Sequence, residues 1–202
     1  MSSVERLYAL FNSVRYVVQA GLPGAFAECG VWKGGSVMMM AYALQIMGNI
    51  DRDIYLFDRF EGVTPPTDDD VDLHGQPATE LLQAGDRSSN FFWAYSPIEK
   101  VRANLQKTGY PMERFIFVRG DVMVTVPQQA PRILALLRDW YASTRHEPEQ
   151  LSPRLCDRGV LIIDDYGHFQ GSRKAVDEIL DALTVRYFMN RIDYTGRRLI
   201  KA

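Results

Sequence analysis

The sequence predicts an α/β fold in which a mainly parallel β-sheet is covered by helices on both faces. Short apolar segments of strand length alternate along the chain with longer segments in which apolar residues recur at helical spacing. The short segment 160–163 is apolar at every position, which is typical of a strand that is buried on both sides. With 202 residues and no linker or repeat, the chain 1–202 is expected to form one domain.

The helices are predicted from periodicity and from the residues that begin and end them. In the first helix, apolar residues recur every three or four positions until Gly21, a residue type that commonly ends helices. Ser36 supplies a hydroxyl that could cap the second helix. The predicted helices cover residues 4–20, 36–47, 97–107 and 170–183.

Strands are predicted where four or five mainly apolar residues lie between turn residues. They cover residues 25–29, 54–57, 115–118, 133–137 and 160–163, and 185–191 with 197–201 would close the sheet as a hairpin. The acidic, proline-containing segment 62–95 breaks this alternation. Long connections of this kind often form lids or binding loops, so we expect a substrate loop here.

Composition excludes several classes of protein. The net charge of −2 argues against a nucleic-acid binder, which needs a basic surface. No apolar run approaches the length of a membrane span, and residues 1–5 do not open a signal peptide. Cys29 and Cys156 are too few for a disulfide framework or a zinc site. We therefore expect a cytoplasmic protein without nucleic-acid or membrane partners. The first helix and Trp93-Ala94-Tyr95 suggest a homodimer.

The strand 160–163 ends in two adjacent carboxylates, Asp164 and Asp165. In open α/β sheets, ligands bind just beyond the carboxyl ends of the strands. Adjacent carboxylates repel each other unless a cation or a shared proton neutralises them, and Mg²⁺ prefers such oxygen ligands. The pair therefore indicates a metal site, with a plain Asp-Asp turn as the alternative.

Asp139 follows the fourth predicted strand, so its carboxylate would join Asp164 and Asp165 over neighbouring strand ends. Three carboxylates can hold one Mg²⁺ ion and leave positions open for a substrate hydroxyl, whose pKa the metal lowers. His168 lies close in sequence and is a candidate base, with a solvated loop histidine as the alternative.

A glycine-rich turn lies between the first strand and its helix, and it includes Glu28, Gly30, Gly34 and Ser36. Glycines allow a sharp turn and a close approach to a ligand. The pattern lacks the Gly-x-Gly-x-x-Gly of dinucleotide sites, which argues against a nicotinamide cofactor and favours a nucleoside without phosphates, such as S-adenosylmethionine. A plain strand–helix turn is the alternative.

Two further acids follow strand ends. Asp58, after the second strand, could accept hydrogen bonds from ribose hydroxyls, or it could cap a helix. Asp121, after the third strand, could reach an adenine amino group, although a turn explains it better.

Several motifs resemble the macrocin O-methyltransferase (TylF-type) family of Mg²⁺- and S-adenosylmethionine-dependent sugar O-methyltransferases. They lie in one order, nearly from end to end, at residues 27–36, 55–62, 95–97, 104–111, 139–144, 162–171 and 190–196. The resemblance implies a Rossmann-like class I methyltransferase fold with a seven-stranded sheet, and methyl transfer to a sugar hydroxyl of a glycosylated natural product. It also implies that Asp164 and Asp165 bind metal, while Glu28, Gly30, Gly34 and Asp58 border the cofactor.

One departure from the family affects the site. Family members usually have Leu-Arg-Leu-Asp-x-Asp-x-Tyr-x-Ser-Thr after the fourth strand, with the first Asp as metal ligand and the second as proposed base. Here 137–141 is about three residues shorter and has only Asp139. Aligned on 140–144, Asp139 is the base; aligned on the strand, it is the metal ligand. We favour the second alignment because the sheet fixes strand length while loops absorb deletions.

Either alignment leaves one carboxylate missing, so His168 or a hydroxide on the metal would have to replace it. Pro148, where the family has a helix-forming residue, would cost about 3 kcal/mol inside a helix. The alternative hypothesis is therefore a non-catalytic member that binds S-adenosylmethionine.

Overall fold

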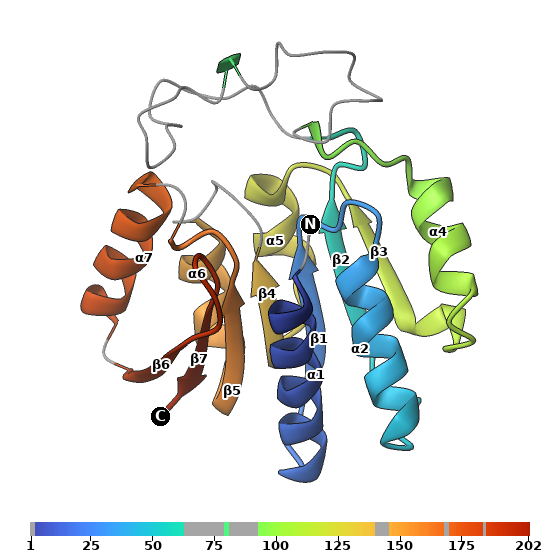
Figure 1. Ribbon diagram of the computed structural model, residues 1–202, viewed down its shortest axis with the longest axis horizontal. Helices are drawn as coiled ribbons and strands as arrows, with labels where there is room; N and C mark the ends of the chain where they lie inside the picture. Colours follow the sequence, from blue (N-terminus) through green and yellow to red (C-terminus); the bar gives the residue numbers. More distant parts are fainter. Residues whose placement is uncertain (1–2, 63–78, 81–92, 140–145, 168–169, 184) are drawn as a thin grey trace.

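The computed structural model describes residues 3–62, 79–80, 93–139, 146–167, 170–183 and 185–202, and they form a seven-stranded sheet (Figure 1). The strand order is β3-β2-β1-β4-β5-β7-β6. The first five strands in this order are parallel, while β7 runs antiparallel to β5 and β6. The expected mainly parallel sheet with a closing hairpin is confirmed. The strands are β1 (Ala25–Cys29), β2 (Ile54–Asp58), β3 (Phe115–Arg119), β4 (Leu134–Asp139), β5 (Leu155–Ile163), β6 (Tyr187–Arg191) and β7 (Arg197–Lys201).

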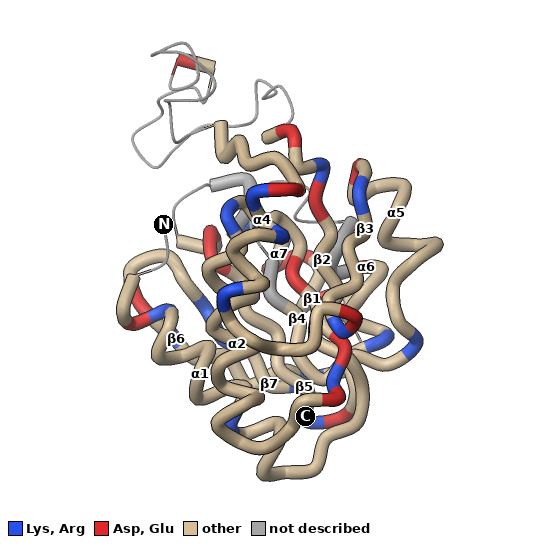
Figure 2. The backbone as a smooth tube through the Cα atoms, turned by 90° about the vertical axis from the view of Figure 1, so that its right-hand side faces the viewer, with Lys and Arg blue, Asp and Glu red and all other residues tan. Residues whose placement is uncertain are grey.

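Helices cover both faces of the sheet. In the edge-on view, α1 and α2 lie on one side of the strands and α5 and α6 on the other (Figure 2). The helices are α1 (Val4–Gln19), α2 (Gly35–Ile46), α4 (Ile98–Gln106), α5 (Val122–Gln129), α6 (His146–Leu151) and α7 (Gln170–Ala182), with short 3₁₀ turns at Met112–Arg114 and Ser152–Arg154.

Alternation along the strands divides the core into two layers. On β1, Phe26 packs into the layer under α1, α2 and α4, whereas Ala27 packs into the layer under α5, α6 and α7. On β5, Val160 and Leu161 divide in the same way. Successive strand residues point to opposite faces, which is why these strands are apolar at almost every position.

Helix α1 begins at the edge where the parallel strands end (Figure 1). Its N-cap is Ser3, whose hydroxyl accepts a hydrogen bond of 3.2 Å from the backbone N–H of Arg6. Leu10, Val14 and Val17 lie on its buried face. Packing of this face against the sheet therefore keeps the first turn of α1 near the carboxyl ends of the parallel strands.

Two expectations about helix ends were wrong. Gly34, not Ser36, is the N-cap of α2; it has φ of 82°, which lies in the left-handed region that glycine adopts without strain. Ser36 is inside the helix and buried. Pro148 lies in the first turn of α6, where a backbone N–H has no partner within the helix, so the expected energetic cost does not apply.

Helix α5 was not predicted, because its eight residues are too few to show a clear helical periodicity. Asp121 is its N-cap. The predicted strand 133–137 lies instead at Leu134–Asp139, so Asp139 ends the strand rather than following it. The predicted loop 62–95 falls mostly outside the described residues.

Candidate functional site

The carboxyl ends of β1, β2, β4 and β5 lie side by side at one edge of the sheet, and they carry most of the predicted site residues. The register aligns Asp139 with Cys29 on one side and with Ile163 on the other. Asp164 follows Ile163, so it lies one residue further along the strand direction than Asp139. The backbone brings the three predicted metal-site positions to neighbouring strand ends, as expected.

The β1–α2 turn is held from several sides. Gly30 donates its N–H to Phe57 O at 2.9 Å, and Asn104 Nδ2 donates to Lys33 O at 3.0 Å. A Cβ atom on Gly34 would lie 3.3 Å from Val101 Cγ1, so this glycine also permits close packing against α4. These contacts hold the backbone of the turn in one conformation.

Glu28 precedes this turn on β1 and has no exposed surface. Its neighbours Ala27 and Cys29 point to the layer under α5, α6 and α7, so alternation directs Glu28 to the opposite layer. A carboxylate buried in this way is costly unless charge or hydrogen bonding compensates it. Among the predicted cofactor residues that have an ionisable side chain, Glu28 is the most deeply buried.

Asp58 binds the β1–α2 turn rather than pointing away from it. Its Oδ2 accepts hydrogen bonds from the N–H groups of Val31 (2.6 Å) and Trp32 (3.1 Å), and its Oδ1 accepts one from Phe60 (2.6 Å). Burial raises the pKa of Asp58 above its ordinary value, and the hydrogen bonds from Phe60, Trp32 and Val31 oppose that rise. A contact of this carboxylate with ribose stays a prediction.

Two of the residues that donate to Asp58 have unusual backbone geometry. Trp32 has φ of 48° and Phe60 has φ of 58°. For residues with a Cβ atom this left-handed conformation costs roughly 1–2 kcal/mol. The three hydrogen bonds to Asp58 compensate for this strain and keep both turns in place.

The two ends of the predicted loop that follows β2 lie against each other. A Cβ atom on Gly62 would lie 2.4 Å from the carbonyl oxygen of Trp93, so residues 62 and 93 are in direct contact. The predicted substrate loop thus leaves and re-enters the described structure at one place, beside Asp58 and Phe60.

Asp121 caps α5, because its Oδ1 accepts a hydrogen bond of 2.9 Å from Met123 N–H. A contact of Asp121 with adenine stays a prediction. Ser36, with 4% of its surface exposed, lies in the first turn of α2.

Asp164 is fully buried and Asp165 is half-buried. The β6–β7 turn holds this segment: Thr195 Oγ1 donates to the Asp164 carbonyl oxygen at 2.5 Å, and Gly167 N–H donates to Thr195 O at 3.0 Å. The side chain of Asp139 and the whole of His168 lie outside the described part of the chain. Within the described part, no group of three metal-binding side chains comes together.

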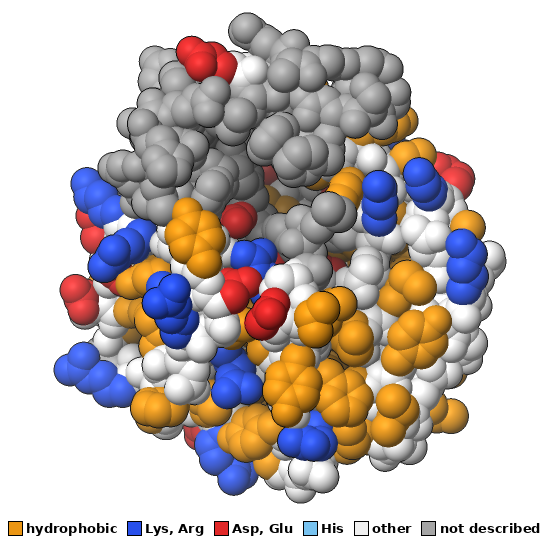
Figure 3. Space-filling model, viewed as in Figure 1, with side chains coloured by type: hydrophobic (Ala, Val, Ile, Leu, Met, Phe, Trp, Pro, Cys, Tyr) orange, Lys and Arg blue, Asp and Glu red, His pale blue; other side chains and the backbone are white. Residues whose placement is uncertain are grey.

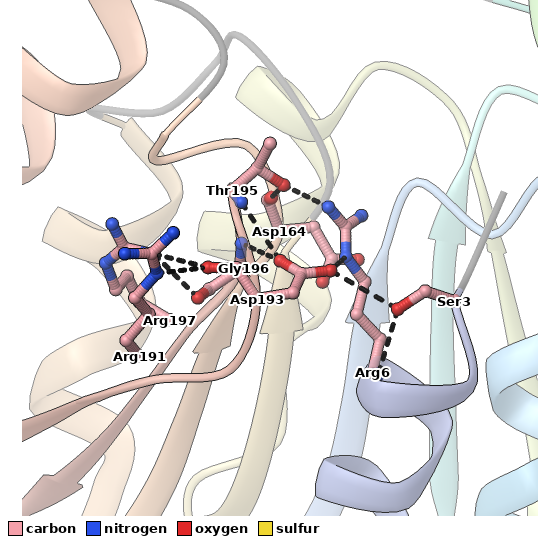
Figure 4. A network of polar contacts seen from close by, with 8 residues as sticks. All are labelled: Ser3, Arg6, Asp164, Arg191, Asp193, Thr195, Gly196 and Arg197. Carbon is pink, nitrogen blue, oxygen red and sulfur yellow. Dashed lines mark hydrogen bonds and ion pairs between the residues drawn. The ribbon is translucent and has the colours of Figure 1, made fainter.

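A polar network around Asp193 was missed by the sequence analysis (Figure 4). Asp193 Oδ1 accepts from the N–H groups of Thr195 (3.0 Å) and Gly196 (2.6 Å). Its Oδ2 accepts from Arg6 Nε (2.8 Å) and from Ser3 Oγ (3.3 Å). The first turn of α1 is thereby tied to the hairpin turn, although nearly the whole chain separates them, and no local pattern signals such a contact.

Hydrophobic and charged side chains gather in different parts of the surface around these elements (Figure 3). Exposed hydrophobic side chains lie over α1 and α2, among them Tyr8, Tyr42 and Ile46. An open hollow of about 660 Å³ lies between α7 and the β6–β7 hairpin. Its lining includes Tyr166, Arg173, Asp177, Arg191, Tyr194 and Arg197.

Residues 1–199 match the family model described as macrocin-O-methyltransferase (TylF). The chain belongs to this family. A tetracenomycin rhamnosyl 4'-O-methyltransferase from Streptomyces olivaceus is 31% identical over 97% of this chain and 73% of that protein. Mycinamicin III 3''-O-methyltransferase from Micromonospora griseorubida is 28% identical over 97% of this chain and 76% of its own length.

The solved structure of the O-methyltransferase NovP superposes with a TM-score of 0.82 and 27% identity, over 99% of this chain and 81% of that one. The family resemblance is therefore confirmed, and the chain is an S-adenosylmethionine-dependent O-methyltransferase. In the part of the chain that the structure describes, no helix has both the length and the apolar character needed to cross a bilayer.

Removing the Asp58 carboxylate should destabilise the protein by disrupting the β1–α2 turn. Asp58→Ala leaves the N–H groups of Val31, Trp32 and Phe60 without their acceptor, and we expect a loss of about 2 kcal/mol in the free energy of unfolding. Asp58→Asn keeps one acceptor oxygen, so its loss of unfolding free energy should be smaller than that of Asp58→Ala. Urea denaturation measures both, with Asp51→Ala on an exposed acid as control. Equal losses for Asp58→Ala and Asp51→Ala would contradict the role of Asp58.

The Asp193 network should make stability depend on pH. Burial alone would raise the pKa of Asp193, but hydrogen bonds from Gly196, Arg6 and Thr195 and the charge of Arg6 together hold it below its ordinary value. A lowered folded-state pKa stabilises the protein above the unfolded-state pKa of about 3.9, and this contribution is lost as pH falls through the folded-state pKa.

Asp193→Asn should therefore be less stable than the wild type near neutral pH, and the difference should shrink in acid. Urea unfolding from neutral pH into the acid range measures it. Asp157→Asn, on an exposed acid of β5, shows the effect of removing one negative charge. A difference that stays constant into acid would rule out this contribution from Asp193.

Proposed function

We propose that this protein methylates a sugar hydroxyl of a glycosylated natural product, using S-adenosylmethionine as methyl donor and Mg²⁺ at the acceptor site. The observation that carries the proposal is the burial of Asp164 beside Asp165, at the same strand edge as the β1–α2 turn. The sugar acceptor is supported by relatives named for O-methylation of rhamnosyl tetracenomycin and of mycinamicin III.

The β1–α2 turn fits a nucleoside cofactor without phosphates. Its backbone is anchored by Asp58, its glycines permit a sharp turn, and Glu28 supplies a buried carboxyl group. A carboxyl group beside the turn can accept hydrogen bonds from the hydroxyl groups of a nucleoside, whereas it offers a pyrophosphate no positive charge. Glu28, Gly30, Gly34 and Ser36 are the residues proposed to border S-adenosylmethionine.

The Asp164–Asp165 pair fits a hard divalent cation. A fully buried carboxylate next to a second one is unfavourable unless positive charge or a proton neutralises them, and both groups offer only oxygen ligands. Asp139 is proposed as the third ligand. Its place as the last residue of β4, level with Ile163, supports the alignment in which the strand fixes its position.

Methyl transfer requires that the acceptor oxygen, the methyl carbon and the departing sulfur lie in line. When bound, Mg²⁺ supplies charge that lowers the pKa of an acceptor hydroxyl, and S-adenosylmethionine supplies the methyl group. The protein's own task is to hold both molecules at neighbouring strand ends, which makes the reaction effectively unimolecular. With Asp139 proposed at the metal, His168 is the candidate to take the hydroxyl proton.

Ligand binding should raise the melting temperature of the protein. Saturation at about 100 times Kd adds roughly 2.7 kcal/mol, which for a protein of this size is a rise of about 5–10 °C. We expect such a rise with S-adenosylmethionine, and a larger one when Mg²⁺ replaces chelator. No response to S-adenosylmethionine would refute the cofactor site. A response without any effect of Mg²⁺ would refute the metal site and favour the non-catalytic alternative.

Asp165→Ala should abolish Mg²⁺-stimulated methylation of rhamnosylated acceptors while leaving the affinity for S-adenosylmethionine largely intact, because the two ligands contact different strand ends. Turnover is measured by transfer of labelled methyl groups and affinity by calorimetry. Asp157→Ala, at the other end of β5, serves as the matched acidic control. Wild-type turnover by Asp165→Ala in Mg²⁺ would exclude this residue as a ligand.

A further inference from the structure

We infer that Thr195, Arg6 and Asp193 are positioning residues that hold the Asp164–Asp165 pair in the geometry required for metal binding. The inference rests on the proposed function of that pair. None of the three side chains is proposed to touch the metal or the substrate. They act by fixing the backbone on which the two carboxylates stand.

Thr195 contacts the segment 164–167 at both ends. Its hydroxyl donates to the carbonyl oxygen of Asp164 at 2.5 Å, and its own carbonyl oxygen accepts from Gly167 N–H at 3.0 Å. A Cβ atom on Gly167 would lie 2.3 Å from Tyr194 O, so the segment packs directly on the hairpin backbone. Asp165 therefore lies between two fixed points.

Arg6 sets the direction of the Thr195 hydroxyl. Arg6 Nη2 donates to Thr195 Oγ1, so this lone pair is occupied and the hydroxyl hydrogen is free to point at Asp164 O. The positive charge of the guanidinium polarises the hydroxyl that it contacts. A chain of two hydrogen bonds thus runs from α1 through Thr195 to the metal-site backbone.

Asp193 contacts both Arg6 and Thr195 and so fixes their positions relative to each other. One carboxylate oxygen accepts from the backbone of Thr195 and Gly196, and the other forms the ion pair with Arg6 Nε. The Arg6 and Asp193 side chains are only 12% and 19% exposed. Because the pair is largely shielded from water, it is screened less by salt than an exposed pair.

Groups that orient metal ligands from outside the coordination sphere commonly change metal affinity by about 10- to 100-fold when removed. Thr195→Val removes the hydroxyl while keeping nearly the same shape. We expect it to weaken the binding of Mn²⁺, which takes the same oxygen ligands as Mg²⁺, by about tenfold. Affinity for S-adenosylmethionine should be unchanged, because the β1–α2 turn makes none of these contacts. Thr195→Ser should restore metal binding.

The matched control is Thr108→Val. Thr108 is also buried, and its hydroxyl also donates to a carbonyl (Leu105 O, 2.7 Å) and accepts an N–H (Tyr110, 3.2 Å), but it lies after α4, away from the Asp pair. Melting temperatures of both variants report the cost to folding. Mn²⁺ affinity, followed by the electron paramagnetic resonance signal of the free ion, reports the positioning role.

Selective loss of Mn²⁺ affinity in Thr195→Val, with rescue by serine, supports the inference. If the wild type binds Mn²⁺ and Thr195→Val binds it equally well, the positioning role is overturned while the metal site stands. If the wild type itself does not bind Mn²⁺, the proposed metal site fails and the inference with it.

Should Thr195→Val fail to fold, Arg6→Lys provides the same test. Lysine keeps the charge but lacks the planar fork that bridges Asp193 and Thr195. Reduced Mn²⁺ affinity in the folded Arg6→Lys variant supports the role, and wild-type affinity overturns it.

Discussion

The site edge of this protein depends on two aspartates that satisfy backbone N–H groups in turns. Asp58 accepts three such bonds and holds the β1–α2 turn, and Asp193 accepts two and holds the β6–β7 turn. Residues in these turns lack the regular hydrogen bonds of the sheet, so their N–H groups need acceptors from elsewhere. A carboxylate provides two oxygens with several lone pairs, which suits this task better than any neutral side chain.

The two aspartates serve different halves of the proposed reaction. Asp58 supports the turn that is proposed to border the cofactor, while Asp193, with Arg6 and Thr195, supports the segment that carries Asp164 and Asp165. Strands β1 and β5 are separated only by β4, so the two supported segments lie close together beyond the carboxyl ends of these strands. Donor and acceptor can thereby be held by rigid elements rather than by side chains alone.

Much of this arrangement could be predicted from the sequence because its signals are local. The apolar run 160–163 followed by two aspartates identifies a strand and its edge, and Gly30 and Gly34 identify a turn. Helix α5 was missed because it is short, and the cap of α2 was misassigned because a left-handed Gly34 replaces a side-chain cap. Arg6 could not be assigned, since its contact with Asp193 is set by tertiary packing. The place of Asp139 followed from strand length, but which role its carboxylate takes depends on groups that sequence spacing does not specify.

The contact between Gly62 and Trp93 has an evolutionary consequence. A segment whose two ends already touch can change in length at little cost, because the entropy of closing a loop grows only with the logarithm of its length. A change in the length of chain between Gly62 and Trp93 is therefore compatible with the sheet and both supported turns as described. If the acceptor pocket lies in this segment, as the sequence predicts, a family built in this way could acquire new acceptors by exchanging one insertion, without changing the sheet.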